Sequence, residues 1–292
     1  MSLREIIARA EQSLVAGPHA DRARLDAETL TLHLLEKAQP GRNRAWLRAN
    51  LGAEAEPELV ATLDLLVTRR TAGEPIQYIT GETEFYGLPF SVRPGVLIPR
   101  PETEHLVEEV LRLATEFDCP RIADIGTGSG AIAVALAAKL PDAKVSAVDI
   151  SPVALSIAAE NAERNGVTER VSFLHGDLLA SLSGERFQII ASNPPYVPAV
   201  DCDSLSVEVR DFEPHCALFA GEDGLEIYRR LIPDAQVNLE SGGYLVMEIG
   251  FGQQAVIEEL LRANHYERID FLKDYQGIPR VAVGQKSAFT EA

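Results

Sequence analysis

The alternation of strand-like and helix-like segments from residue 121 onward is the feature that most constrains the fold. Each strand-like run is short and apolar, and the longer segments between runs have helical periodicity. The strand-like runs are 121–124, 144–149, 171–174 and 187–192, and the helix-like segments are 131–140 and 152–165. This alternation predicts an α/β fold with a mostly parallel, doubly wound sheet, which binds ligands at the carboxyl ends of its strands.

The pattern continues to the C-terminal part of the chain. We predict a helix over Leu106 to Leu113 before the first strand, and a further helix that begins at Leu225. The remaining elements are a strand at 243–249, a helix at 254–263 and two final strands near 269–272 and 280–283.

Residues 3 to 71 predict a small helical bundle instead. Apolar residues recur three and four positions apart, as helical periodicity requires. Asp21 and Asn43 are candidate N-caps, and Pro57 suits the first turn of a last helix that ends near Arg70. We therefore expect a helical domain over residues 1–73.

The stretch from Gly73 to Pro94 is rich in glycine and proline between short β-prone runs. These runs are Ile76 to Thr80 and Leu88 to Val92. We interpret residues 74–95 as a connector that contains a β-hairpin, and expect the α/β domain to cover residues 96–292.

A glycine-rich loop, Asp-Ile-Gly-Thr-Gly-Ser-Gly at 124–130, follows the first predicted strand. Glycines there let the backbone approach a ligand at a helix N-terminus, although tight packing alone would also explain them. Asp149 ends the second strand, where a carboxylate can accept the ribose hydroxyls of a nucleoside. Asp177, after the third strand, is either an acceptor for an adenine amine or a solvated loop acid.

The four residues Asn193-Pro194-Pro195-Tyr196 follow the fourth strand, whose end should adjoin the loop after the first strand. The prolines remove two backbone donors and stiffen the turn, which leaves the Asn193 side-chain oxygen and the Pro194 carbonyl as acceptors. Two acceptors beside a flat tyrosine ring suit a planar NH2 group. The motif thus suggests methylation of a planar nitrogen, with a merely rigid loop as the structural alternative.

The segment Leu97 to Glu104 carries a third constellation, Arg100-Pro101-Glu102-Thr103-Glu104. Proline and acids at a helix start are ordinary helix initiation. The charged loop could equally cover a substrate entrance, and both interpretations remain open at this point.

The chain is acidic, with 27 Lys and Arg against 44 Asp and Glu and a net charge of −17. The acidity belongs to the part after the helical domain. Proteins that grip a phosphate backbone usually present a basic face, so this balance argues against a nucleic-acid partner. A local patch of Arg42, Arg44 and Arg48 is the one candidate exception.

Cysteine spacing and hydropathy argue against several other classes of protein. Cys119, Cys202 and Cys216 have no CxxC spacing, which disfavours a zinc site or a disulfide framework. We expect no bound metal, no membrane span, no signal peptide and a cytoplasmic location. A monomer is the default expectation.

Taken together, these motifs resemble the N5-glutamine methyltransferases that modify peptide chain release factors, and the resemblance covers nearly the whole chain. Arg100 to Glu104 is the discriminating segment, because the related enzymes that act on a ribosomal protein carry a different sequence there. The other matching segments are 73–81, 124–130, 193–196, Ala217-Leu218, 221–225, 248–250 and 274–277 with Arg280. His215-Cys216 departs from the family pattern, which leaves the role of that loop open.

The resemblance implies a Rossmann-like class I methyltransferase sheet with S-adenosylmethionine as methyl donor and S-adenosylhomocysteine as product. The implied substrate is the glutamine of the Gly-Gly-Gln motif of release factors, with the helical domain helping to dock the partner. The implied cofactor-binding residues are Gly126, Thr127, Gly128, Gly130, Asp149, Asp177 and Asn193. The implied catalytic residues are Asn193, Pro194 and Tyr196, and the implied substrate-binding residues are these three with Pro195, Arg100, Glu102 and Thr103.

Three alternatives stand beside this interpretation. A DNA N6-adenine methyltransferase would use the same acceptors on a flipped base, but it would need a basic duplex-binding surface. A ribosomal-protein glutamine methyltransferase is disfavoured by Arg100 to Glu104. A nucleoside-binding scaffold on the translation machinery would not need the Asn193 acceptor.

Overall fold

The computed structural model describes residues 1–288, and these fall into two compact units. The helical unit comprises Met1–Gly81 and Leu205–Phe212. The sheet unit comprises Glu82–Ser204 and the described residues from Glu213 onward. Packing divides the chain at other positions than the expected functional domains 1–73, 74–95 and 96–292, whose limits stay predictions.

The helical unit is built from α-helices that bury one apolar face each. The helices are α1 (Leu3–Leu14), α2 (Ala23–Ala38), α3 (Arg44–Ala49), α4 (Pro57–Thr71) and α5 (Ile76–Thr80). In α1 the buried positions are Leu3, Ile6, Ile7, Ala10 and Leu14, which recur every three or four residues as one stripe. These side chains join a common core with α2, α4 and α5, so the predicted helical bundle is confirmed.

Side chains cap the starts of α1 and α3 in this unit, whereas α2, α4 and α5 begin without a side-chain cap. The Asn43 side chain accepts a hydrogen bond from the Trp46 backbone N–H and caps α3, as predicted. The prediction for Asp21 is wrong, because α2 begins at Ala23 and Asp21 lies in a short 3₁₀ turn before it. Ser2 forms a capping box with Glu5 at the start of α1.

The segment Leu205–Phe212 leaves the sheet unit and returns to it, and its helix α9 (Val207–Phe212) belongs to the helical unit. It is held there by Arg70 at the end of α4, which is 1% exposed. Arg70 Nε donates to Asp26 Oδ2 at 2.6 Å, and its Nη1 donates to the Glu74 carbonyl and to the Glu208 carboxylate. One buried guanidinium therefore links α2, α4 and α9.

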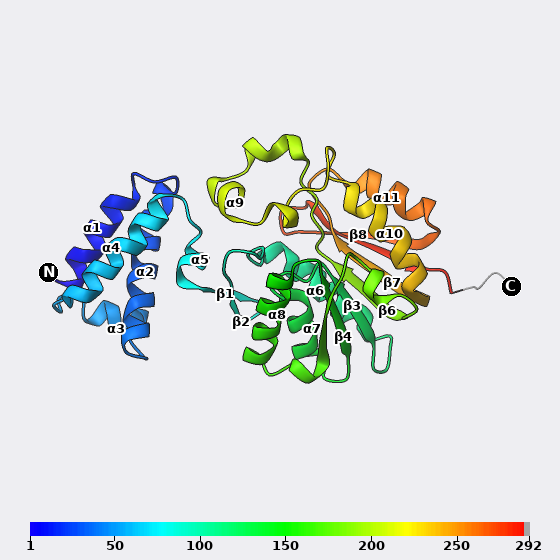
Figure 1. Cartoon of the computed structure of the whole chain (residues 1–292), viewed down its shortest axis with the longest axis horizontal. Helices are drawn as coiled ribbons and strands as arrows, with labels where there is room; N and C mark the ends of the chain where they lie inside the picture. Colours follow the sequence, from blue (N-terminus) through cyan, green and yellow to red (C-terminus); the bar gives the residue numbers. More distant parts are fainter. Residues whose placement is uncertain (289–292) are drawn as a thin grey trace. The chain divides into compact units, whose positions relative to one another are not determined.

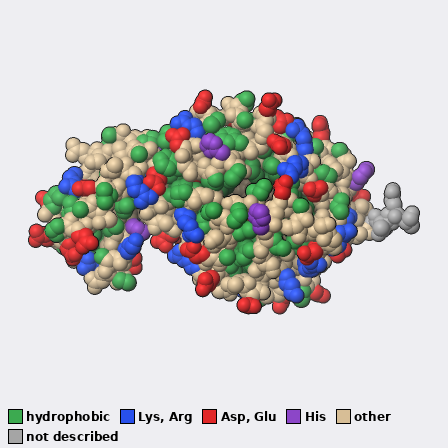
Figure 2. Space-filling view, in the orientation of Figure 1, with side chains coloured by type: hydrophobic (Ala, Val, Ile, Leu, Met, Phe, Trp, Pro, Cys, Tyr) green, Lys and Arg blue, Asp and Glu red, His purple; other side chains and the backbone are tan. Residues whose placement is uncertain are grey.

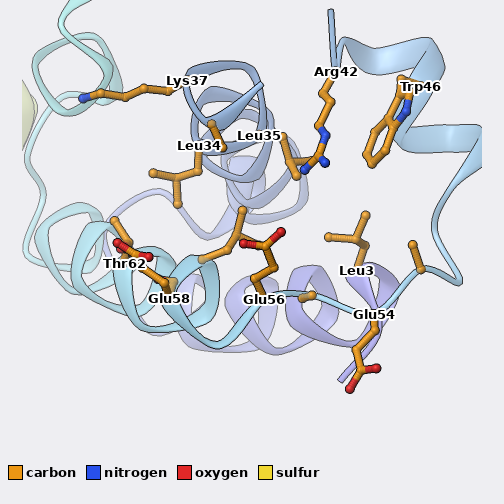
Figure 3. Close-up of a pocket in the computed structure, with 14 residues that line it drawn as sticks. Leu3, Leu34, Leu35, Lys37, Arg42, Trp46, Glu54, Glu56, Glu58 and Thr62 are labelled. Atoms are coloured by element: carbon orange, nitrogen blue, oxygen red, sulfur yellow. Dashed lines mark hydrogen bonds between the residues drawn. The ribbon is translucent and has the colours of Figure 1, made fainter. Parts of the chain in front are cut away.

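A groove of about 400 Å³ lies among α2, α3 and α4 (Figure 3). Leu34 and Leu35 lie on one side of it, and the Arg42 guanidinium lies 4.9 Å from the centroid of the Trp46 ring at one end. Acidic side chains occupy the opposite edge, namely Glu54, Glu56 and Glu58.

The predicted connector contains one correction. Residues 76–80 form helix α5 and not a strand, because Ile76, Tyr78 and Ile79 turn to one buried side and Gly81 ends the helix with a φ of 82°. The connector does contain a hairpin, as predicted, but its first strand is β1 (Glu82–Phe85), which pairs antiparallel with β2 (Leu88–Ser91).

The sheet unit contains a seven-stranded sheet of order β5-β4-β3-β6-β7-β9-β8. Its strands are β3 (Arg121–Ile125), β4 (Lys144–Asp149), β5 (Val171–His175), β6 (Phe187–Ser192), β7 (Leu239–Glu248), β8 (Tyr266–Lys273) and β9 (Pro279–Lys286). The pairs among β3 to β7 are parallel, and β9 pairs antiparallel with β7 and β8. The predicted α/β, mostly parallel sheet is thus confirmed.

Helices cover both faces of this sheet (Figure 1). On one face pack α6 (Glu104–Ala114), α7 (Ala131–Lys139) and α8 (Pro152–Arg164), and on the other pack α10 (Glu226–Asn238) and α11 (Gln254–Ala263). Successive residues of β3 point to opposite faces of the sheet, so Ile122 packs in one hydrophobic core and Ala123 in the other. The order of strands places β3 and β6 side by side in the middle of the sheet.

Two surface properties bear on the choice among partners. Within residues 1–288, no helix combines the length and the apolar character that crossing a bilayer requires. On the face drawn in Figure 2, Lys and Arg side chains are interspersed with Asp and Glu instead of forming one broad basic surface.

Candidate active site

A cavity of about 260 Å³ lies at the carboxyl ends of β3, β4 and β6 in the sheet unit. The predicted residues that line it are Gly126, Gly128, Asp149, Asp177, Asn193, Pro194 and Pro195. The tertiary structure therefore gathers residues from the glycine loop, the second strand and the Asn-Pro-Pro-Tyr motif around one space. Thr127, Gly130, Tyr196, Arg100, Glu102 and Thr103 are not among its lining residues.

The glycine loop adopts a backbone that side chains would hinder. Gly126 and Gly128 have φ values of 74° and 56°, and a β-carbon on either would meet no heavy atom within 4 Å. These two glycines thus leave open space beside the cavity. Gly130 serves packing instead, because its β-carbon would lie 3.0 Å from the side chain of Ala158 on α8.

Asp124 holds this loop from inside the protein. Its carboxylate is fully buried and accepts hydrogen bonds from the Thr127 hydroxyl at 2.6 Å and from the Ala133 backbone N–H at 3.1 Å. Burial raises the pKa of Asp124 to about 7, although both hydrogen bonds act in the opposite direction. Thr127 therefore shapes the loop through its bond to Asp124.

Asp149 ends β4 and faces the cavity. One of its oxygens accepts from the Gly128 N–H and the other from the Ser151 N–H, each at 2.8 Å. These bonds fix the carboxylate, and each oxygen retains a further lone pair that can accept from a ligand. The apolar side chains of Leu97, Ile150 and Leu178 line the same space.

Asp177 lies in the turn after β5 and is exposed. Its carboxylate pairs with the Arg230 guanidinium, and both residues line the cavity. An exposed pair of this kind exchanges readily with solvent, so Asp177 stays accessible to a ligand.

The Asn-Pro-Pro-Tyr turn follows β6 directly. The Ser192 hydroxyl donates to the Ile125 carbonyl at 2.7 Å, which ties the ends of β6 and β3 together. Pro194 is buried, and its ring fixes the backbone immediately after Asn193. The acceptors of the turn are thereby placed at the edge of the cavity that the glycine loop also borders.

Asn193 is held by residues from two other segments. Its Nδ2 donates to the Thr103 hydroxyl at 3.0 Å, and that hydroxyl donates to Glu248 Oε2 at 2.6 Å. Thr103 and Glu248 are 4% and 2% exposed. Burial raises the pKa of Glu248, partly offset by its bonds to Thr103 and Tyr196.

Tyr196 points its hydroxyl to the other oxygen of Glu248, at 3.3 Å. Burial, together with the nearby Glu248 charge, raises the pKa of Tyr196 far above its usual range. Two glycines make room for this residue: a β-carbon on Gly224 would lie 2.3 Å from the Tyr196 carbonyl, and one on Gly250 would lie 3.1 Å from its ring. Both glycines belong to segments singled out above by the family resemblance.

The charged residues of the segment before α6 lie apart from the cavity lining. Arg100 Nη2 donates to both carboxylate oxygens of Glu213, at 2.8 and 2.7 Å. Glu102 is exposed. Of this segment, Thr103 is the residue that contacts Asn193.

Several residues of the site escaped sequence reasoning. Asp124 and Ser192 lie in the mostly apolar strands β3 and β6, and their polar side chains face inward. A polar residue within a mostly apolar strand is the sequence signal that could have identified them. Glu248 was noted for its family motif without a role. The cavity also has lining residues whose sequence carries no chemical signal, namely Gly95, Val96, Ala154, Ala217 and Ile227.

Comparison with known proteins decides the family. Residues 5–81 match the model of the PrmC N-terminal domain, and residues 103–208 match that of the methyltransferase small domain. A release factor glutamine methyltransferase from Koribacter versatilis is 44% identical over 92% of this chain and 95% of its own length. The chain belongs to the release factor glutamine methyltransferase family. Another family member, from Moorella thermoacetica, is 43% identical over 96% of this chain and 97% of its own length.

The fold of this family member is also found in solved structures. The Thermus thermophilus 16S rRNA N2 G1207 methyltransferase, solved with AdoMet and guanosine, has a TM-score of 0.52 and 21% identity, covering 70% of this chain and 49% of that one. At that identity the likeness bears on the fold, and it supports the Rossmann-like class I methyltransferase sheet.

Cys119, Cys202 and Cys216 are free thiols, and Cys216 lines the cavity. Across residues 1–288, no group of three or more His, Cys, Asp or Glu side chains is arranged to hold a metal ion.

Proposed function

We propose that this protein transfers a methyl group from S-adenosylmethionine to the side-chain amide nitrogen of the glutamine in the Gly-Gly-Gln motif of peptide chain release factors. The observation that carries the proposal is the cavity that joins the glycine loop and Asp149 to Asn193 and Pro194 in a member of this family. The DNA adenine methyltransferase and ribosomal-protein alternatives are not favoured by the named relatives.

The cavity residues fit a nucleoside cofactor. Gly126 and Gly128 leave open space on one side, and Asp149 presents fixed carboxylate oxygens to ribose hydroxyls. Leu97, Ile150 and Leu178 offer apolar surface for a purine, and Asp177 is a candidate acceptor for its amine. When bound, S-adenosylmethionine supplies an electrophilic methyl group on a sulfonium.

The acceptors of the Asn-Pro-Pro-Tyr turn would hold the glutamine amide. An amide nitrogen is a poor nucleophile because its lone pair is delocalised into the carbonyl. Asn193 Oδ1 and the Pro194 carbonyl would accept the two amide hydrogens, orient the nitrogen and increase its electron density. Pro195 and the Tyr196 ring would border the planar group.

No ionised side chain is needed to remove the proton before transfer. The amide nitrogen becomes acidic as it is alkylated, so its proton leaves late, through the acceptors at Asn193 and Pro194 or to water. The raised pKa of Tyr196 keeps its hydroxyl protonated, so this residue acts as a fixed wall and not as a base. S-Adenosylhomocysteine is the expected product.

Residues outside the cavity complete the proposal. We assign docking of the release factor to the helical unit, which contains the matched N-terminal family domain. Arg100 and Glu102 would contact the protein substrate near the start of α6. We further propose that the protein acts as a cytoplasmic monomer without nucleic acid.

The test is methyl transfer from labelled S-adenosylmethionine to a purified release factor. A release factor with the motif glutamine changed to alanine and a DNA duplex serve as controls. Label on the wild-type factor alone is the expected result. Label on DNA, or equal label on the altered factor, would overturn the assignment.

Two variants separate the two halves of the site. Asn193→Ala should lower kcat about 100- to 1,000-fold, because it removes a preorganised acceptor, and leave cofactor affinity largely intact. Asp149→Ala should weaken cofactor binding about 10- to 100-fold in calorimetry, because a charged acceptor is lost. Near-normal turnover in the first variant would remove Asn193 from its assigned role.

A further inference from the structure

Glu248 and Thr103 form a chain of hydrogen bonds that ends on Asn193. Glu248 ends β7, and Thr103 lies in the 3₁₀ turn immediately before α6, 145 residues away in sequence. Asn193 follows β6, so three separate segments meet at this point. All three residues lie in the sheet unit.

The direction of each bond in this chain is determined by the chemistry of the groups. An ionised carboxylate only accepts hydrogen bonds, and Glu248 accepts one on each oxygen, from Thr103 and from Tyr196. A threonine hydroxyl has one hydrogen, and Thr103 uses it on Glu248. Thr103 can therefore only accept from Asn193, which must turn its Nδ2 toward the hydroxyl.

The consequence is a defined orientation of the Asn193 amide. With Nδ2 bonded to Thr103, Oδ1 is the atom left for another partner, and no group within residues 1–288 donates a hydrogen bond to it. The opposite orientation would present N–H groups to the N–H groups of a substrate amide, which is repulsive. We infer that Thr103 and Glu248 are positioning residues that set the orientation of the Asn193 amide, so that its oxygen faces the substrate nitrogen.

This inference rests on the proposed function and deepens it. It also explains why a carboxylate that accepts from two hydroxyl groups is buried beside the site. Protonated Glu248 could donate to Thr103, which would release the hydroxyl hydrogen toward Asn193 and favour the reversed amide. The charge of Glu248 is thus part of the orienting device.

The surroundings of Glu248 bear on its titration. Arg280 on β9 and the hydroxyls of Thr103 and Tyr196 lower its pKa, whereas burial and the nearby Glu102 raise it. Burial is the largest of these influences, so the pKa lies above the ordinary glutamate value. An acid limb in the rate profile should therefore appear at a higher pH than an ordinary glutamate would give.

The experiment compares Thr103→Val with Thr103→Ser at saturating cofactor and release factor. Valine keeps the shape of threonine but removes the hydroxyl, so kcat should fall about 10- to 100-fold with little change in KM or in cofactor affinity. Serine restores the hydroxyl and should recover most of the loss. Thermal unfolding of both variants controls for a folding defect.

Glu248→Gln gives a second readout that a purely structural role would not move. Because glutamine does not ionise, the acid limb of the kcat profile should disappear in this variant. Tyr244→Phe is a matched comparison, since the Tyr244 hydroxyl also donates to a carboxylate, that of Glu116, but does not touch Asn193. It should retain the acid limb of the wild-type profile.

The outcomes distinguish this inference from the proposed function. If the wild-type protein does not label a release factor, the proposed function fails before the variants are compared. If the wild type is active but Thr103→Val has a kcat within about 2-fold of it, or Thr103→Ser is equally impaired, the orienting role is overturned. Persistence of the acid limb in Glu248→Gln would overturn it as well.

Discussion

In the helical unit the buried carboxylate of Asp26 faces the guanidinium of Arg70, whereas in the sheet unit the buried carboxylates of Asp124 and Glu248 face hydroxyl groups. Asp26 and Arg70 are each 1% exposed. These three buried acids therefore have partners of different kinds, although the sheet unit also contains a buried acid with a cationic partner, Glu213 beside Arg100.

The difference teaches what each carboxylate is for. An ion pair compensates the desolvation of both partners, and it fixes how α2, α4 and α9 meet in the helical unit. A carboxylate with neutral donors is compensated less, and burial raises the pKa of both Asp124 and Glu248. Those two acids border the glycine loop and the Asn193 turn, where orientation of polar groups matters more than stability.

Arg70→Met should have the largest effect on stability. It leaves the buried Asp26 with Arg22, whose Nε lies 3.9 Å from Asp26 Oδ1, as its remaining cationic neighbour. It also removes the link to Glu208, so the free energy of unfolding should fall by about 3 to 5 kcal/mol. Trp46, the single tryptophan, lies in the helical unit, and its fluorescence during denaturant unfolding measures this loss directly.

Arg69→Met is the matched control. Arg69 directly precedes Arg70 in α4 and pairs with Glu74, but 45% of the Arg69 side chain is exposed. An exposed pair contributes about 0 to 1 kcal/mol, so the control should unfold nearly as the wild type does. Equal losses in both variants would break the comparison, because burial of the pair would then be irrelevant.

Asp124→Asn should have an intermediate effect of the opposite sign. The folded protein holds the proton of Asp124 with a pKa of about 7, well above the ordinary aspartate value, so it binds more protons than the unfolded chain between these values. Stability from this group is therefore full at low pH and is lost as the pH rises toward about 7. Asparagine removes that loss.

The net gain should be modest because asparagine adds a buried donor. At pH 8 asparagine removes the penalty of a buried, ionised Asp124, which is larger than the cost of the new N–H group. We expect about 1 to 2 kcal/mol of added stability at pH 8. Calorimetric unfolding between pH 5 and 8 measures the slope, which should be reduced and not abolished, since Glu248 contributes with the same sign. An unchanged slope would mean that Asp124 is not held as a buried acid.

Asn43→Ala should have the smallest effect. It removes the cap of α3 and should cost about 1 kcal/mol, again reported by the neighbouring Trp46. Asp21→Ala is its control, because Asp21 caps no helix and should change stability by less than about 0.5 kcal/mol. A larger loss of stability in Asp21→Ala than in Asn43→Ala would contradict this prediction and mean that Asp21 makes a stabilising contact.

Strong periodicity made most elements predictable from the sequence. The strand at 187–192 was predicted with the bounds that the structure shows. A short apolar run between turn residues, within a pattern that alternates strands and helices, indicates a strand. Residues 76–80 were mistaken for a strand because the periodicity of a five-residue run is too short to distinguish a helical turn from a strand. Helix α9 was missed because a six-residue helix has too few turns to show periodicity.

The candidate site was predictable where a motif carried the chemistry. Gly126, Gly128, Asp149 and Asn193 were named from the sequence and surround one cavity. Thr127 and Gly130 were named for the same motif, but one bonds to Asp124 and the other packs on Ala158. Position within a motif does not tell which side of the loop a residue faces.

The sequence by itself determined the class of fold, the order of elements and the two motifs that must meet at the strand ends, because periodicity and turn chemistry are local. Only the tertiary structure decided that Thr103 and Glu248 reach Asn193 and that Arg70 binds Asp26 and Glu208. These contacts join segments 44 to 145 residues apart. Their physical cause is that a buried polar group must find partners wherever packing places them, and no local pattern records that choice.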